Sequence, residues 1–295
     1  GANKVAAGGD HTCALTSTGG VKCWGSNSQG QLGDNSLTQR NTPVDVSGLT
    51  SGVSAIATGG SHTCALIAST GGVKCWGYNF YGQLGDASNI TRLVPVDVDG
   101  LTSGVSAIAA GSDFTCALIS GGAVKCWGRN HNGQLGDDST ENRNSPVSVS
   151  NLSSGINKIS TGGNHACALN TSGGVKCWGD NNFGQLGDTT IFDRDVPTDV
   201  FGLNTGISAI SAGGNHTCAL TTEGGMKCWG SNTSGQLGDN SIVQKNYPVD
   251  VTGLATGISA IAAGGSHTCA LTTGGGAKCW GYNLYGQVGD TTTTN

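Results

Sequence analysis

Short apolar runs alternate with polar, glycine-rich stretches along the whole chain. One stretch, residues 53–104, contains four such runs, VSAIAT, HTCALI, GVKCWG and VPVDV. Runs of this length, bounded by turn residues, are typical of β-strands, and no segment has the 3.6-residue period of an amphipathic helix. The second and third runs are joined by a tip of three or four residues, STG or ASTG, which predicts a β-hairpin. We therefore expect four strands in this stretch.

The same pattern returns six times. Its first cysteine stands at positions 13, 64, 116, 167, 218 and 269, a spacing of 51 or 52 residues. A four-stranded unit of about this length is the signature of a β-propeller blade, in which neighbouring sheets cover each other's faces. We predict an all-β, six-bladed propeller in which residues 1–295 form a single domain of six repeats of about 51 residues. The fourth run occurs only five times, so the outer edge of the last blade is expected to be open, or to be filled by residues beyond this chain or by a neighbouring subunit.

Composition and charge narrow the classes of function. Only 11% of the residues are charged and the net charge is −5, without a basic stripe that could neutralise a nucleic-acid backbone. No apolar run approaches the roughly 18 residues of a membrane span. Twelve cysteines, two in each repeat, indicate a disulfide framework, which persists in oxidising compartments. We therefore expect an extracellular or cell-surface protein that binds no nucleic acid and does not insert into membranes.

The two cysteines of each repeat are expected to face each other across the hairpin. If Leu15 pairs with Val21, Cys13 lies opposite Cys23 at a separation that a disulfide can span. In the second repeat the tip gains one residue and the cysteine spacing grows by one, so the pair stays opposed. The prediction is one disulfide within each blade. The twelve residues are Cys13 and Cys23, Cys64 and Cys75, Cys116 and Cys126, Cys167 and Cys177, Cys218 and Cys228, and Cys269 and Cys279.

Zinc is one alternative for these cysteines, and free buried thiols are another. Strand alternation places His11, Cys13 and Cys23 on one face, which is three of the four ligands of a tetrahedral site. However, the third repeat has Phe114 in place of the histidine, and no repeat has the short C-x2-C spacing of most structural zinc sites. We expect no metal and no cofactor.

Three recurring motifs, GGxHTCAL, GxVKCWGxNxxGQLGD and PVDVxGLxSGVxAIAAG, resemble the repeats of the regulator-of-chromosome-condensation family over essentially the whole chain. The resemblance implies a β-propeller; family members typically have seven blades, whereas this chain has six repeats. The family's eukaryotic founder is a nuclear guanine-nucleotide exchange factor, and a cysteine pair in every blade is out of place in a reducing nucleus. The repeats of this chain resemble more closely those of secreted bacterial members, such as a β-lactamase inhibitory protein with similar SGVxAIAAG units.

The other repeated polar residues are interpreted as structural. One histidine per repeat, at a fixed strand position in five of the six, is expected to hydrogen-bond the backbone of a neighbouring blade, and the six tryptophans are expected to pack between blades. The aspartate of GQLGD is followed six residues later by a cation in five repeats, as in Asp34 and Arg40, which predicts a salt bridge. Calcium is the alternative, but the loop lacks the D-x-D-x-D-G pattern of acids. No phosphate-binding loop or nucleophile elbow occurs, so no catalytic residue is predicted.

The expected function is a non-enzymatic extracellular scaffold or protein-binding propeller, with self-assembly as one form of it. The alternatives are a secreted protein inhibitor of an enzyme and, disfavoured, a guanine-nucleotide exchange factor. Positions that packing holds constant repeat, whereas positions that face a partner need not. The repeats differ most between the asparagine and the GQ of NxxGQLGD. The apolar residues there, our candidates for partner binding, are Phe80, Tyr81, Phe183, Leu284 and Tyr285. The alternative is that these side chains cover loop backbone or fill gaps between blades.

Overall fold

The computed structural model describes residues 1–295 as strands, turns and loops. It contains no helix that is long and apolar enough to cross a membrane. By its internal contacts the chain divides into two compact units, residues 1–131 with 139–154, and residues 132–138 with 155–295. Each unit carries three of the six repeats, and each repeat forms one antiparallel sheet. The all-β, six-bladed propeller fold is confirmed, and the single domain over residues 1–295 stays a prediction.

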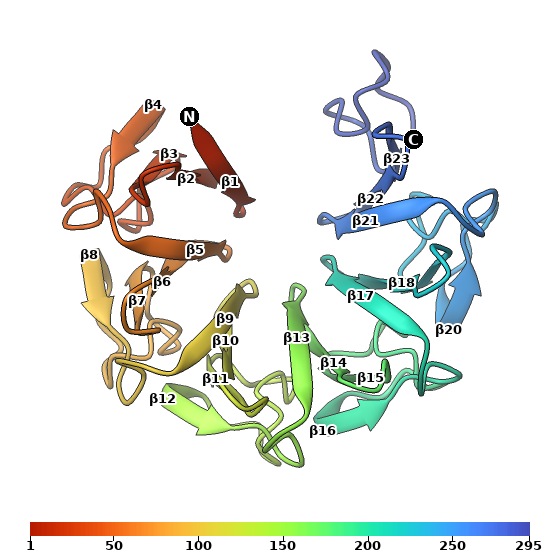
Figure 1. Cartoon of the computed structure of the whole chain (residues 1–295), viewed down its shortest axis with the longest axis horizontal. Helices are drawn as coiled ribbons and strands as arrows, with labels where there is room; N and C mark the ends of the chain where they lie inside the picture. The colour runs from red at the N-terminus through yellow and green to blue at the C-terminus, as the bar shows by residue number, and fades with distance from the viewer. The chain divides into compact units, whose positions relative to one another are not determined.

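The first unit holds three four-stranded sheets, coloured red to yellow-green in Figure 1. Their orders are β1-β2-β3-β4, β5-β6-β7-β8 and β9-β10-β11-β12, so each strand pairs with the next one along the chain. The strands are β1 (Ala2–Ala7), β2 (His11–Thr16), β3 (Val21–Gly25), β4 (Arg40–Asp45), β5 (Val53–Thr58), β6 (His62–Ile67), β7 (Val73–Gly77), β8 (Arg92–Asp97), β9 (Val105–Ala110), β10 (Phe114–Ile119), β11 (Val124–Gly128) and β12 (Arg143–Ser148).

The second unit repeats this arrangement in green to blue (Figure 1). Two sheets have four strands, β13-β14-β15-β16 and β17-β18-β19-β20, and the last, β21-β22-β23, has three. The strands are β13 (Ile156–Thr161), β14 (His165–Asn170), β15 (Val175–Gly179), β16 (Arg194–Asp199), β17 (Ile207–Ala212), β18 (His216–Thr221), β19 (Met226–Gly230), β20 (Lys245–Asp250), β21 (Ile258–Ala263), β22 (His267–Thr272) and β23 (Ala277–Gly281). Within residues 1–295 the last sheet therefore ends at β23.

The observed strands lie close to the predicted runs. VSAIAT and HTCALI coincide with β5 and β6, whereas the fourth strand of that sheet is Arg92–Asp97 and begins two residues earlier than VPVDV. It begins earlier because a bulge between Cys75 and Gly77 lets Arg92 pair with Gly77. A glycine is required at this bulge: a Cβ at the equivalent Gly25, where φ is 110°, would lie 2.6 Å from the carbonyl oxygen of Asp10.

All twelve cysteines form the predicted disulfides within their own sheets. In the first sheet Leu15 pairs with Val21 and Cys13 with Cys23, and the Cα atoms of the two cysteines are 4.1 Å apart. The extra residue of the second repeat lies in the hairpin tip, so Cys64 still pairs with Cys75. No group of three or more His, Cys, Asp or Glu side chains is arranged to hold a metal ion.

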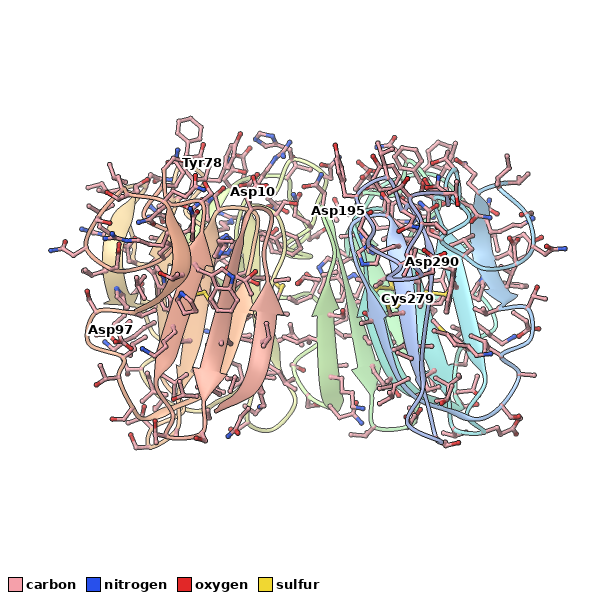
Figure 2. The ribbon with its side chains drawn as sticks, turned by 90° about the horizontal axis from the view of Figure 1, so that it is seen from above. Asp10, Tyr78, Asp97, Asp195, Cys279 and Asp290 are labelled. Atoms are coloured by element: carbon pink, nitrogen blue, oxygen red, sulfur yellow. A yellow bond between two sulfur atoms is a disulfide. The ribbon has the colours of Figure 1, made fainter.

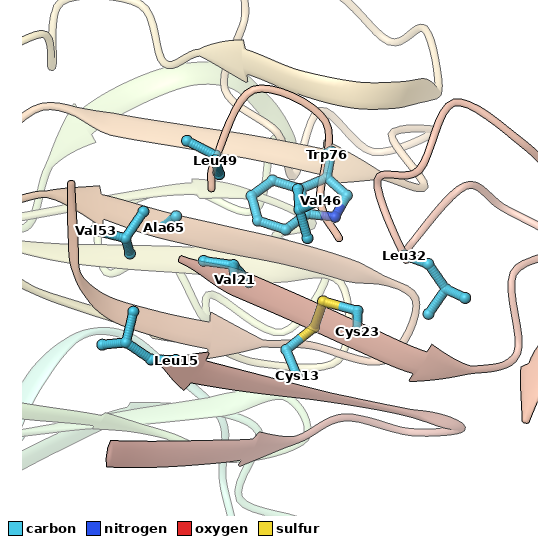
Figure 3. Close-up of a cluster of buried hydrophobic side chains, with 10 residues drawn as sticks. All are labelled: Cys13, Leu15, Val21, Cys23, Leu32, Val46, Leu49, Val53, Ala65 and Trp76. Carbon is cyan, nitrogen blue, oxygen red and sulfur yellow. A yellow bond between two sulfur atoms is a disulfide. The ribbon is translucent and has the colours of Figure 1, made fainter. Parts of the chain in front are cut away.

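The hydrophobic core lies between neighbouring sheets. In Figure 3 the Cys13–Cys23 disulfide and Val21 of the first sheet pack with Trp76 of the second, together with Val46 from the loop after β4. The Trp76 indole is fully buried and donates from Nε1 to the carbonyl oxygen of Gln31 at 3.0 Å. Tryptophan thus fills the space between blades, as predicted, and its one polar atom is satisfied.

The prediction that the repeated histidine bonds to a neighbouring backbone is wrong. His11 Nε2 lies 2.8 Å from the hydroxyl of Thr63 in the next sheet, and that hydroxyl donates to the carbonyl oxygen of Gln31 at 3.0 Å. The Thr63 hydroxyl has one proton and donates it to the carbonyl oxygen of Gln31, so it accepts a hydrogen bond from His11 Nε2. Strand alternation fixes the face of a side chain but not the group opposite it. The same histidine–threonine contact joins His62 to Thr115, His165 to Thr217 and His216 to Thr268.

Candidate functional site

The variable residues predicted to bind a partner sit in loops that follow the third strand of each sheet. In the second sheet, the buried Asn79 donates to Asp86 and to the carbonyl oxygens of Ser88 and Ile90, all at 3.1 Å, and accepts from the Leu84 amide at 2.9 Å. The side chain of Gln83 likewise accepts from the Tyr81 amide at 3.0 Å. Because these constant residues satisfy the loop backbone from inside, the residues between them are free to vary.

Phe80 and Tyr81 belong to a group of rings that we call the aromatic cluster: Tyr78, Phe80 and Tyr81 from this loop, and His131 from the equivalent loop of the third sheet. Phe80 stacks on Tyr78 with 6.4 Å between ring centroids and meets Tyr81 edge-on at 5.0 Å. Tyr81 also packs edge-on against His131 at 5.8 Å. Figure 2 shows Tyr78 at the same edge of the sheets as Asp10, while Asp97 lies away from that edge.

The aromatic cluster is exposed rather than buried between blades. Phe80 is 64% exposed, so its ring neither fills a gap nor covers loop backbone to any large extent. Tyr81 is half-buried, and the guanidinium of Arg129 lies 5.5 Å from its ring centroid, within reach of a cation–π contact. The cluster combines two exposed rings, Phe80 and His131, with the half-buried rings of Tyr78 and Tyr81 that pack against them, which are the properties of an interface anchor.

Charged groups beside the aromatic cluster have shifted pKa values. Burial raises the pKa of Asp113, and the charge of Arg129, 3.9 Å away, opposes that shift. Burial also raises the pKa of the Tyr78 hydroxyl, and the neighbouring Tyr81 and Asp113 raise it further. Both shifts follow first from burial of these groups beside the aromatic cluster.

The remaining candidates lie in the second unit. Leu284 and Tyr285 are 56% and 82% exposed, and Tyr285 packs edge-on against Tyr282 at 6.2 Å. Phe183 is the least exposed of the candidates on the fourth and sixth sheets. The structure thus brings Phe80 and Tyr81 together on one loop and places Phe183 on a different sheet from Leu284 and Tyr285.

Sequence reasoning missed a second set of exposed apolar residues. They lie three or four positions after the aspartate of GQLGD, and they are Leu37, Ile90, Ile191, Phe192, Ile242 and Val243. In the second sheet, the Asn89 side chain donates to the carbonyl oxygen of Phe80 at 3.0 Å, so Ile90 follows directly after a residue tied to the aromatic cluster. These residues could have been found from the sequence, because the repeats also differ from one another at these positions.

The predicted aspartate–cation pair holds together the two variable loops of a repeat, the one before GQLGD and the one after it. We call this arrangement the clamp. Asp188, whose side chain is 3% exposed, accepts from Asn181, from the amide and hydroxyl of Thr190, and from Arg194. Burial alone would raise the pKa of Asp188, but these donors and the charge of Arg194 hold it below its usual range. The same ion pair joins Asp34 to Arg40, Asp86 to Arg92 and Asp239 to Lys245.

We expect removal of this clamp to destabilise the fold far more than removal of a surface ion pair. Asp188→Ala leaves several buried donors without an acceptor and should lower the free energy of unfolding by about 2–4 kcal/mol. The matched control in the same sheet is Asp199→Ala, which removes the pair with Lys176; Asp199 is 67% exposed, and the loss should stay below about 1 kcal/mol. Urea unfolding of both variants at pH 7 measures the difference, and equal losses would contradict the clamp.

The chain matches one protein family from end to end. Residues 1–295 match the family described as RCC1-like domain. The ultraviolet-B receptor UVR8 of Arabidopsis thaliana is 32% identical over 292 residues, which cover 97% of this chain and 66% of UVR8. The human E3 ubiquitin-protein ligase HERC2 is 35% identical over 91% of this chain but only 6% of the ligase. The chain therefore spans less than two thirds of the length of these relatives.

Solved structures agree with the family. Yeast RCC1 (Prp20) bound to Kap60 superposes with a TM-score of 0.85 at 25% identity, covering 99% of this chain and 72% of that one. Prp20p from Saccharomyces cerevisiae, described with its binding properties to Gsp1p and histones, gives 0.82 at 26% identity over 99% of this chain and 74% of that one. RCC1-like propellers typically bind proteins and are generally non-enzymatic. With six sheets in the repeat pattern of this family over its full length, the chain belongs to the RCC1-like propeller family.

Proposed function

We propose that this chain is a non-enzymatic protein-binding propeller that works outside the cell or at its surface, and that its partner docks on the aromatic cluster. The observation that carries the proposal is the exposed ring of Phe80, held between Tyr78 and Tyr81 on a loop whose backbone is already satisfied by buried side chains. Exposed aromatic residues with restrained geometry are the usual anchors of protein interfaces.

The location outside the cytosol is supported by the six disulfides. A disulfide in every sheet is stable in an oxidising compartment and is reduced by the thiol pool of the cytosol. Alkylation of free thiols in freshly fractionated cells, followed by mass spectrometry, tests this part. Oxidised chain should be found in the extracellular or surface fraction, and a reduced cytosolic pool would contradict the proposal.

The docking surface is tested by removing its anchors. Phe80→Ser combined with Tyr81→Ser should weaken partner capture or self-association by about 30-fold or more, since an aromatic anchor contributes about 2 kcal/mol or more. The matched control is Phe201→Ser, because Phe201 is 63% exposed but lies outside both variable loops. Capture from the extracellular fraction and sedimentation of the purified chain distinguish a separate partner from a second copy.

Thermal unfolding of the same variants separates binding from folding. The double variant should melt close to the unmodified chain, because Phe80 is mostly exposed. If association is unchanged, or is lost only together with the fold, the cluster is structural and the proposal fails. Leu284→Ser with Tyr285→Ser then shows whether the exposed residues of the sixth sheet bind the partner instead.

A further inference from the structure

Arg129 follows directly after β11, at a position where no other repeat has a basic residue. The equivalent residues are Ser26, Tyr78, Asp180, Ser231 and Tyr282. The guanidinium carbon of Arg129 lies 5.5 Å from the ring centroid of Tyr81, and Tyr81 meets Phe80 edge-on at 5.0 Å. A positive charge that departs from the repeat pattern therefore lies one ring away from the exposed side chain of Phe80.

The guanidinium of Arg129 is not used inside the chain as other arginines are. Arg40, Arg92 and Arg194 each donate from Nε to the aspartate of their own loop at 2.8 or 2.9 Å. Nε of Arg129 is buried and has no hydrogen-bond partner, and its outer nitrogens form no hydrogen bond either. The side chain is 28% exposed. A buried donor without an acceptor is unfavourable, so the guanidinium is open to an acceptor from outside the chain.

Asp113 provides the nearest carboxylate, and it leaves the donors of Arg129 unused. The distance from Nη1 of Arg129 to Oδ2 of Asp113 is 3.9 Å, whereas a charge-assisted hydrogen bond measures about 2.7–2.9 Å. The other oxygen of Asp113 accepts from Nε2 of Gln83 at 3.4 Å. This long ion pair does not hold Arg129 in the way that the clamp holds Arg194.

We propose that Arg129 binds a carboxylate of the protein that docks on the aromatic cluster. The segment recognised there has an apolar residue and, one or two positions away, an aspartate or a glutamate. The inference rests on the proposed docking surface and adds the chemistry of its partner. The apolar side chain lies on Phe80, and the carboxylate accepts two hydrogen bonds from the planar guanidinium, which matches its geometry. Contact with Tyr81 restricts the arginine, so less side-chain entropy is lost on binding.

The charges at this place favour a partner acid over a partner base. A cation that approached Asp113 would lie close to the guanidinium of Arg129, and like charges repel. Burial raises the pKa of Asp113, so its charged form is disfavoured, whereas an arginine side chain stays charged at all relevant pH values. The group with the stronger need for a counterion is therefore Arg129.

A display library of random peptides tests the recognised pattern on the 1–295 chain. Sequences enriched by the unmodified chain should carry an acid one or two positions from an apolar residue. Arg129→Glu should enrich sequences that have lysine or arginine in place of the acid, because the sign of the charge at the site is reversed. Phe80→Ser should lose the enrichment, since it removes the apolar anchor. If Arg129→Glu enriches the same acidic sequences, the inference is wrong.

One enriched peptide, synthesised with both ends blocked, measures the contact by calorimetry. Replacing its acid by the matching amide should weaken binding to the unmodified chain by about tenfold or more, but should change binding to Arg129→Gln by less than about twofold. The matched control is Lys125→Gln. It removes one positive charge from the other end of β11, where the strand partner is Ser148, and should leave the tenfold difference unchanged.

Asp113→Asn tests the opposite arrangement, in which Asp113 takes a partner cation. This variant should bind the acidic peptide at least as tightly as the unmodified chain, because it removes a competing carboxylate. Loss of peptide binding with the fold retained would assign the contact to Asp113 and overturn the role of Arg129. Thermal unfolding checks the fold of each variant; Arg129→Gln should melt close to the unmodified chain, since its guanidinium makes no internal hydrogen bond.

The outcomes separate this inference from the proposed docking surface. Enrichment that survives Phe80→Ser, or no enrichment at all, contradicts the docking surface and the inference together. Enrichment that requires Phe80 but selects no acid leaves the docking surface in place and overturns only the role of Arg129. The same holds if the change from acid to amide weakens binding equally in the unmodified chain and in Arg129→Gln.

Discussion

Reduction of the six disulfides is expected to unfold the chain at neutral pH. Each disulfide closes a loop with a sequence separation of 10 or 11 residues, for which the chain-entropy estimate is about 2.5–3 kcal/mol. Six such loops add roughly 15 kcal/mol, which equals or exceeds the net stability of a typical domain, about 5–15 kcal/mol. Circular dichroism and tryptophan fluorescence with and without a phosphine reductant measure the change. A reduced chain that keeps its cooperative transition would contradict this expectation.

The disulfides should not be reduced together. Cys116 and Cys126 are almost fully buried, whereas Cys269 and Cys279 are partly exposed. Timed alkylation with mass spectrometry should therefore find the Cys269–Cys279 disulfide reduced first. Replacing Cys116 and Cys126 by alanine should lower the free energy of unfolding by about 2–4 kcal/mol, from lost loop closure and lost packing. The pair Cys269 and Cys279, replaced in the same way, provides the comparison, with a smaller packing loss.

The strands and disulfides could be predicted because each rests on a local pattern. VSAIAT and HTCALI are bounded by glycines, and the inserted residue of the second hairpin left Cys64 opposite Cys75, so the register followed from counting residues. The aspartate–cation pair was visible as a constant spacing, but the 3% exposure of Asp188 was not, because burial depends on segments distant in sequence. That burial turns an apparent surface ion pair into a clamp.

Contacts between sheets were harder to predict. The partner of His11 is Thr63, 52 residues away, and alternation along one strand carries no information on the neighbouring sheet. One clue was present: the third repeat has Phe114 where the others have histidine, and the fourth repeat has Ala166 where the others have threonine. The candidate surface was found only in part, since Phe80 and Tyr81 stood out as aromatic, whereas Ile90 is exposed in a loop of ordinary composition.

As the pH is lowered, the free energy of unfolding should begin to fall at a pH well above the range in which carboxylates titrate. Burial lowers the pKa of His62 and His165 to about 3 and that of His11 and His216 to about 4. In each, Nε2 is used on a threonine and the buried Nδ1 has no partner, so the folded state holds the neutral ring. An unfolded histidine titrates near 6.5 and binds a proton more readily than the folded one. The stability from these four residues is therefore complete above pH 6.5 and is lost as the pH falls toward 4.

The expected loss is large and can be assigned to single residues. At pH 5 each buried histidine should lower the free energy of unfolding by about 2 kcal/mol, or about 8 kcal/mol for the four. Denaturant unfolding at pH 7.5 and pH 5 measures it. His165→Phe with Thr217→Ala copies the residues of Phe114 and Ala166 and should remove about a quarter of the pH dependence. Phe114→Leu, in the repeat that has no histidine at this position, is the control and should leave the slope unchanged. If the His165 and Thr217 variant keeps the full slope between pH 7.5 and 5, the loss comes from other groups and the buried neutral rings are not its cause.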